Sequence, residues 1–178
     1  MKQELTPKNE LEMALVTDTF RPEEALEGPT IQCRGPREIA PECVFHFPDG
    51  ILGFERAKKY VFMMNEKSRP FLFMQSLDEP DLSFVCVQTF MLRPDYALTL
   101  TPEQSARLAL ESQDDALVLS LVTVKKDFSE TTANLMSPVV INMKSRVGGQ
   151  FVSSDASYPV RFKIWEAIEE RTVVSKAV

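Results

Sequence analysis

The chain has 178 residues, of which 44% are hydrophobic and 26% are charged, a composition that fits one globular domain with a sizeable core. Its formal net charge of −6 opposes binding to phosphate backbones, which depends on clustered Lys and Arg, so direct contact with nucleic acid is not expected. One histidine and three cysteines without C-x-x-C spacing favour neither a metal site nor a disulfide framework, and no cofactor motif is present.

Membrane insertion is not expected either. The longest apolar runs, such as residues 82–87 and 116–124, are far shorter than the roughly 18 residues that a transmembrane helix needs. The sequence begins MKQELTPKNELEM, which has acidic residues where a secretory leader would have its apolar core. The sequence therefore predicts a cytoplasmic protein.

The chain divides into three segments by pattern. Residues 1–29 contain scattered acids and prolines and no sustained period of 2.0 or 3.6, which predicts a loosely ordered N-terminal arm. Residues 30–160 alternate short β-rich runs with turn signals, which predicts an antiparallel sandwich or barrel. Residues 161–178 form a C-terminal extension. The expected strands are Thr30–Arg34, Cys43–Phe47, Lys59–Met64, Pro70–Ser76, Leu82–Phe90, Tyr96–Leu100, Ala116–Val124 and Pro138–Met143.

Two turns between these strands have a clear physical signal. In Pro48-Asp49-Gly50, a proline with fixed φ precedes a residue that is free to adopt positive φ. In Glu79-Pro80-Asp81-Leu82, proline occupies the second position of a type I turn. Both segments are predicted to reverse the chain.

One short helix is expected between two strands. Thr101-Pro102-Glu103-Gln104 combines an N-cap threonine, a proline at the first helical position and a glutamine that completes a capping box. Ala106, Ala109 and Leu110 recur at helical spacing, so this stripe is expected to face the sheet.

A second helix is expected in the C-terminal extension, over residues 161–171. Phe162, Trp165 and Ile168 recur every three residues, and Ile164 lies one turn before Ile168. This apolar face either packs on the chain's own barrel or occupies and gates a groove for a partner.

Catalysis is a remote alternative. Asp78, Glu79 and Asp81 could act as general acids and bases, but Pro80 between them favours a solvated turn. Thr131 and Thr132 could act as hydrolase nucleophiles only beside a base, and the nearest carboxylate belongs to their chain neighbour Glu130. We therefore expect no enzyme activity and name no catalytic residue.

Several segments together resemble one protein family. They are FPDGILGFE (residues 47–55), QSLDEPDLSFV (residues 75–85), PDY (residues 94–96) and TTANLMSPVVIN (residues 131–142). Their order and spacing are similar to those of the bacterial flagellar assembly factor FliW family, over residues 30–160. The resemblance implies a small β-barrel-like binding module without enzyme activity. Such a protein would hold flagellin in the cytoplasm as a chaperone, and would bind the translational repressor CsrA to relieve its repression of flagellin synthesis.

The resemblance leaves the contact residues and the partners open. The candidates are polar residues that the fold does not obviously require, and an interaction barrel with unrelated partners is the alternative function. The N-terminal arm and the C-terminal extension depart from the family pattern. The candidate contact residues are Asp78, Glu79, Asp81, Asp95, Thr131, Thr132 and Asn134.

Overall fold

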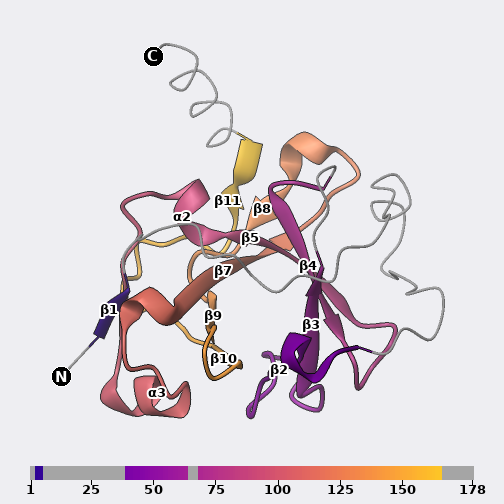
Figure 1. Cartoon of the computed structure of the whole chain (residues 1–178). Coiled ribbons are helices and arrows are strands. Elements are labelled where there is room, and N and C mark those ends of the chain that lie inside the picture. Colours follow the sequence, from indigo (N-terminus) through magenta and orange to yellow (C-terminus); the bar gives the residue numbers. More distant parts are fainter. Residues whose placement is uncertain (1–2, 6–38, 64–67, 166–178) are drawn as a thin grey trace, which may run out of the picture.

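The computed structural model describes residues 3–5, 39–63 and 68–165, and every structural statement below concerns these residues (Figure 1). Its main feature is a closed barrel of seven strands in the order β7-β5-β4-β3-β2-β10-β9, with β9 pairing back to β7. Neighbouring strands are antiparallel except β2 and β10, which are parallel. The predicted mainly β, barrel-like fold is therefore confirmed. The barrel strands are β2 (Phe45–His46), β3 (Lys59–Met63), β4 (Phe71–Ser76), β5 (Ser83–Gln88), β7 (Ala116–Thr123), β9 (Val139–Asn142) and β10 (Val147–Gln150).

Shorter elements surround the barrel. A separate two-stranded sheet joins β1 (Gln3–Leu5) to β6 (Leu98–Leu100), while β8 (Thr132–Ala133) and β11 (Phe162–Lys163) extend the large sheet beyond β7. No helix in the described ranges is long and apolar enough to cross a membrane. The helical elements are α2 (Thr89–Leu92), α3 (Pro102–Arg107) and the 3-10 turns η1 (Pro41–Cys43), η2 (Gln113–Asp115) and η3 (Phe128–Glu130).

The barrel strands separate two apolar layers. In β7, Leu117 and Leu119 belong to the cluster inside the barrel, whereas Val118 between them belongs to a second cluster outside it. We call these clusters the inner and the outer layer. The buried residues of the inner layer are Phe45, Phe47, Ile51, Ala57, Tyr60, Phe62, Leu72, Met74, Cys86, Leu117, Leu119, Val139 and Ile141. Those of the outer layer are Leu5, Val87, Leu92, Tyr96, Leu98, Leu100, Leu108, Leu110, Val118, Ala133, Leu135, Val140, Tyr158 and Ile164.

The strand predictions succeed where hydrophobic runs are long. Strands β3, β4, β7 and β9 each begin and end within one residue of a predicted run. The strand predicted over residues 82–90 is wrong at its C-terminal end, because β5 ends at Gln88 and α2 begins at Thr89. Strands β8, β10 and β11 were not predicted, and Thr30–Arg34 lies outside the described residues.

Strand β10 shows why its sequence did not indicate a strand. Its Gly148-Gly149 pair has low strand propensity and no side chain to alternate. A Cβ atom on Gly148 would lie 2.4 Å from Cζ of Phe47, so this strand can pack over the Phe47 ring only with glycine there. Gly148 therefore lowers the strand propensity of this segment and is also the residue that the packing against Phe47 requires.

The predicted helix forms at α3, with a different buried face. The capping box is present, because Gln104 N donates to Thr101 Oγ1 at 3.2 Å and Thr101 N donates to Gln104 Oε1 at 2.8 Å. The expected apolar stripe is wrong, since Ala106 and Ala109 are exposed. The helix ends at Arg107 and Ala109 adopts φ +50°, which redirects the chain. The buried residues that follow the helix are Leu108 and Leu110.

The two ends of the chain also differ from expectation. Residues 3–5 of the arm are not loosely ordered but form β1, because Leu5 is buried in the outer layer. Phe162 and Lys163 are not helical but form β11, which pairs with β8. Most of the predicted C-terminal helix, residues 166–171, lies outside the described residues.

Candidate functional site

Two of the motif-bearing segments leave the barrel from one end, together with a third segment. Strand β2 is parallel to β10, and β3 is antiparallel to both β2 and β4, so β2, β4 and β10 run in one direction. The segments that follow them are the loop 47–57, the turn 77–82 and the chain after Gln150. We call this end of the barrel the loop end.

The loop 47–57 presents apolar side chains to solvent. Gly50 and Gly53 have φ of +72° and +84°, and a Cβ atom on Gly50 would lie 2.7 Å from Cα of Glu55. The loop turns twice in succession, because Gly50 N donates to Phe47 O and Phe54 N donates to Ile51 O. Phe47 and Ile51 are consequently buried, while Leu52 is 59% exposed. Phe54 is 41% exposed and packs edge-on against the ring of Phe84 in β5, with centroids 5.2 Å apart.

Gln150 joins this loop to the turn after β8. Its Oε1 accepts a hydrogen bond from Leu52 N at 3.1 Å, and its Nε2 donates to Ser137 O at 3.0 Å. Asn134 Oδ1 in turn accepts from Ser137 N at 3.0 Å. Val152 follows two residues after Gln150 and is 61% exposed. The segments FPDGILGFE and TTANLMSPVVIN, far apart in sequence, are thus connected through one amide side chain.

The turn 77–82 is tied to the loop 47–57 by Asp78. Asp78 Oδ2 accepts hydrogen bonds from the backbone N–H groups of Lys58 at 2.6 Å and Lys59 at 2.8 Å. These bonds lower the pKa of the Asp78 carboxyl, with the bond from Lys58 contributing most. Gln75 Nε2 donates to Pro80 O and Leu82 O, which fixes the turn from within. Asp78 therefore has a structural role in this turn.

Two other acids of the turn point into solvent. Glu79 and Asp81 are exposed, and their side chains make no hydrogen bond or ion pair to any residue that the structure describes. The predicted turn is confirmed by the hydrogen bond from Leu82 N to Glu79 O at 2.9 Å. Within the described part of the chain, these two carboxylates have no partner that would compete with another molecule.

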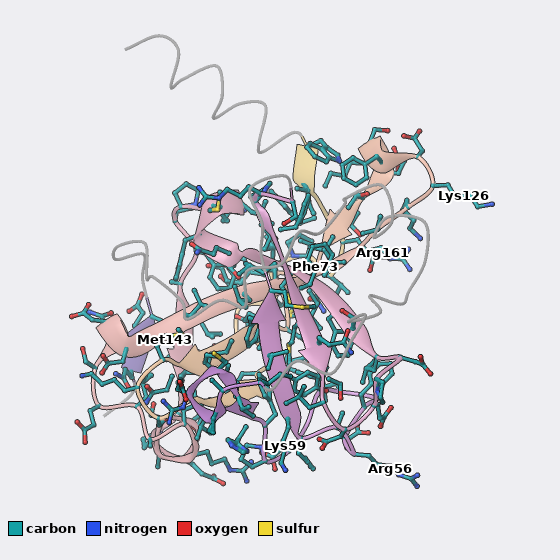
Figure 2. All side chains as sticks on the ribbon, turned by 45° about the vertical axis from the view of Figure 1, so that its right-hand side comes forward. Arg56, Lys59, Phe73, Lys126, Met143 and Arg161 are labelled. Atoms are coloured by element: carbon teal, nitrogen blue, oxygen red, sulfur yellow. The ribbon has the colours of Figure 1, made fainter. Side chains whose placement is uncertain are left out.

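The remaining candidate residues lie elsewhere. Asp95 is exposed and pairs with Arg93 at 2.7 Å, which lowers the pKa of its carboxyl. Thr132 is half-buried in β8 between β7 and β11. Figure 2 shows Arg56, from the loop 47–57, at the lower right and Lys126, from the connection between β7 and β8, at the upper right. Asp95 and Thr132 stay predictions as contact residues.

Thr131 needs a correction. Its side chain is fully buried, with Oγ1 accepting from Lys125 N at 3.4 Å, so it cannot touch a partner in this structure. Its backbone oxygen accepts from Ile164 N, which anchors the chain after β11. The acid beside it, Glu130, pairs with Lys163 at 3.2 Å and does not face Thr131 as a base. Within the described residues, Glu130 is therefore not placed to activate Thr131.

Metal ligands do not converge in the described ranges, where no three His, Cys, Asp or Glu side chains form a group that could hold an ion. Cys86 is fully buried, and burial raises the pKa of its thiol. The chemistry of the loop end is therefore that of a surface made of apolar side chains, carboxylates and hydrogen-bonded turns.

Sequence reasoning missed the apolar part of this surface. Leu52, Phe54 and Val152 would ordinarily be assigned to a core, because large apolar residues are mostly buried. The available signal was the pair of glycines that flank Ile51-Leu52, because glycines mark turns and connecting segments lie mostly at the surface. Gln150 had no signal, because its role depends on both segments that it joins.

Comparisons with known proteins agree with the motifs. The family described as FliW protein matches residues 30–164 of this chain. A flagellar assembly factor FliW from Caldicellulosiruptor saccharolyticus is 35% identical over 132 residues, which cover 74% of this chain and 86% of that protein. A flagellar assembly factor FliW from Syntrophomonas wolfei is 32% identical over 145 residues, which cover 80% of this chain and 93% of that protein.

The fold is similar as well. A crystal structure of the flagellar assembly factor FliW superposes with a TM-score of 0.69 at 30% sequence identity. The superposition covers 76% of this chain and 94% of that one. The matched region includes both the barrel and the loop end, and it leaves β1 outside the range 30–164.

Proposed function

The chain belongs to the FliW family of flagellar assembly factors, and from this membership we propose that it works by partner switching. In this proposal it binds flagellin as a cytoplasmic chaperone. When flagellin has been exported, it binds the translational repressor CsrA and relieves repression of flagellin synthesis. It acts without catalysis and without touching RNA itself.

The observation that carries this proposal is the exposed apolar surface of the loop end. Leu52, Phe54 and Val152 are 59%, 41% and 61% exposed, in segments connected by Gln150. Contiguous patches of exposed apolar side chains mark protein interaction sites, and we propose that these three side chains belong to one such patch. Flagellin termini are amphipathic helices, and a helix of this kind buries its apolar face against such a surface.

Carboxylates at the same end support binding to a basic repressor. Glu79 and Asp81 project from the turn 77–82, whose backbone is fixed by Asp78 and Gln75. Exposed acids accelerate the encounter with a positively charged protein and matter less for the final affinity. We propose that flagellin and the repressor use overlapping or coupled surfaces here, which would convert the flagellin level into repressor activity.

Isothermal titration with purified flagellin and CsrA tests the proposal. Leu52→Asp should weaken flagellin binding at least about tenfold, because it places a charge at an apolar contact while the backbone bond to Gln150 remains. Val160→Asp is the matched control, since Val160 is 58% exposed and follows Pro159 in another segment. No detectable binding of the unmodified chain to either protein would contradict the proposal and favour an interaction barrel with other partners.

Association kinetics test the part played by the acids. Asp81→Lys should slow association with CsrA and reduce its dependence on salt, with little effect on dissociation. Glu111→Lys makes the same charge change on an exposed residue after α3. Equal slowing by both variants would show that net charge, and not the turn 77–82, steers the encounter.

A further inference from the structure

The N-terminal strand binds the barrel domain in the way that a separate peptide would. Strand β1 pairs antiparallel with β6 in the register Gln3↔Leu100, Glu4↔Thr99 and Leu5↔Leu98. The two strands form a sheet of their own, apart from the large sheet. Figure 1 shows β1 at the periphery of the molecule, near α3. It lies outside the range 30–164 that the family model matches.

Side-chain burial follows the alternation of this strand. Leu5 is 1% exposed and packs in the outer layer with Leu98 and Leu100. Glu4 and its partner Thr99 are exposed on the other face. The strand also lies against η2. An apolar anchor in a pocket, together with main-chain hydrogen bonds along a strand edge, is the arrangement by which extended peptides add to sheets.

We propose that the edge of β6 is a docking site for an extended peptide strand, and that the N-terminus of this chain is its tethered occupant. The site recognises a strand that places a leucine at the position of Leu5 and polar side chains outward. Residues 6–38 join this strand covalently to the domain. A tether makes the binding intramolecular and raises the effective concentration of β1 at the site.

Two physical features favour a separable strand over an integral part of the fold. Strand β1 has three residues, and a two-stranded sheet is only marginally stable by itself. Leu5 is the only fully buried side chain of β1, so the packing of this one residue contributes most to the binding of β1 to the domain. Vacating the site would expose the backbone edge of β6 and the leucines beneath it, a surface that pairs readily with another strand. The N-terminus therefore controls access to that edge.

Peptide binding in trans tests this proposal independently of flagellin and CsrA. The probe is a fluorescent peptide of residues 1–8, and the protein is the chain lacking residues 1–5. We expect saturable binding in fluorescence anisotropy, and binding at least about tenfold weaker to the full chain, whose site is occupied. A peptide carrying Leu5→Asp should bind the truncated chain at least about tenfold more weakly, because it brings a carboxylate to an apolar pocket.

The proposal is overturned if a folded truncated chain does not bind the peptide, or if the truncated and full chains bind it equally. A second experiment covers a truncated chain that does not fold. A specific protease site inserted within residues 6–38 of the full chain is cut after folding. We expect the N-terminal fragment to co-elute with the domain in gel filtration, to exchange with the labelled peptide, and to be lost when it carries Leu5→Asp. A fragment that separates at every protein concentration, or one retained equally with Leu5→Asp, would overturn the proposal.

Discussion

The inner and outer layers bury apolar residues in different ways. The inner layer is rich in rings that meet edge-on, such as Phe45 with Phe62 and Phe47 with Tyr60, each pair with centroids 5.1 Å apart. The outer layer is rich in leucine and takes Leu5 and Ile164 from opposite ends of the sequence. Strand alternation thus builds the first layer, whereas chain segments that cross outside the barrel complete the second.

The largest effect is expected inside the barrel. Phe62→Ala should lower the free energy of unfolding by about 3–5 kcal/mol, because it leaves a ring-sized cavity among side chains held by a closed sheet. Urea denaturation measures this. Phe54→Ala is the control at a 41% exposed ring and should cost about 1 kcal/mol or less. Similar losses from the two variants would contradict the assignment of Phe62 to a rigid core.

The outer layer should tolerate truncation better. Leu98→Ala removes a buried side chain but is expected to cost about 2–3 kcal/mol, since the loops and β1 that cover it can relax into the space. The same urea experiment compares it directly with Phe62→Ala. A loss as large as that of Phe62→Ala would show that the outer layer is as rigid as the barrel interior.

Two buried tyrosines give a sharper contrast between the layers. Tyr96 in the outer layer donates from its hydroxyl to Leu135 O at 2.8 Å, so Tyr96→Phe should cost about 1–2 kcal/mol. Tyr60 in the inner layer is also buried, and its hydroxyl makes no hydrogen bond to the described part of the chain. Burial raises the pKa of Tyr60 to about 12, so the group stays neutral. Tyr60→Phe should leave the melting temperature unchanged or raise it. Destabilisation by Tyr60→Phe would require a partner for that hydroxyl.

The smallest effect is expected at the turn 77–82, and it depends on pH. The pKa of the Asp78 carboxyl is lower in the folded state than in the unfolded chain. On acidification, Asp78 is therefore protonated at a higher pH in the unfolded chain than in the folded protein, which favours unfolding. The contribution of Asp78 to stability is present above its unfolded pKa, near 4, and is lost as the pH falls through the lower folded value. Asp78→Asn should flatten the acid side of the stability profile. Asp81→Asn, in the same turn but without a hydrogen bond from Lys58 or Lys59, is the matched control, and an equal flattening by both variants would contradict the role given to Asp78.

Local patterns predicted the parts of this fold that local chemistry determines. The long runs became β3, β4, β7 and β9, and the capping box at Thr101 began a helix. Strand β10 was not predicted, because its Gly148 is required for packing against Phe47, which is distant in sequence. The same limit applies to the candidate site. Asp78 was assigned to a turn, but its backbone donors are Lys59, the first residue of β3, and Lys58 just before it, and no spacing in the sequence indicates that contact.

The parallel pairing of β2 with β10 has a consequence for the order of folding. His46 pairs with Val147, so the barrel cannot close until the chain has been synthesised beyond that point. Until then β2 has β3 on one side and an unpaired edge on the other. Unpaired edges in incomplete chains are sites of aggregation, and long-range closure slows folding. The last barrel strand to leave the ribosome is therefore the one that protects the first.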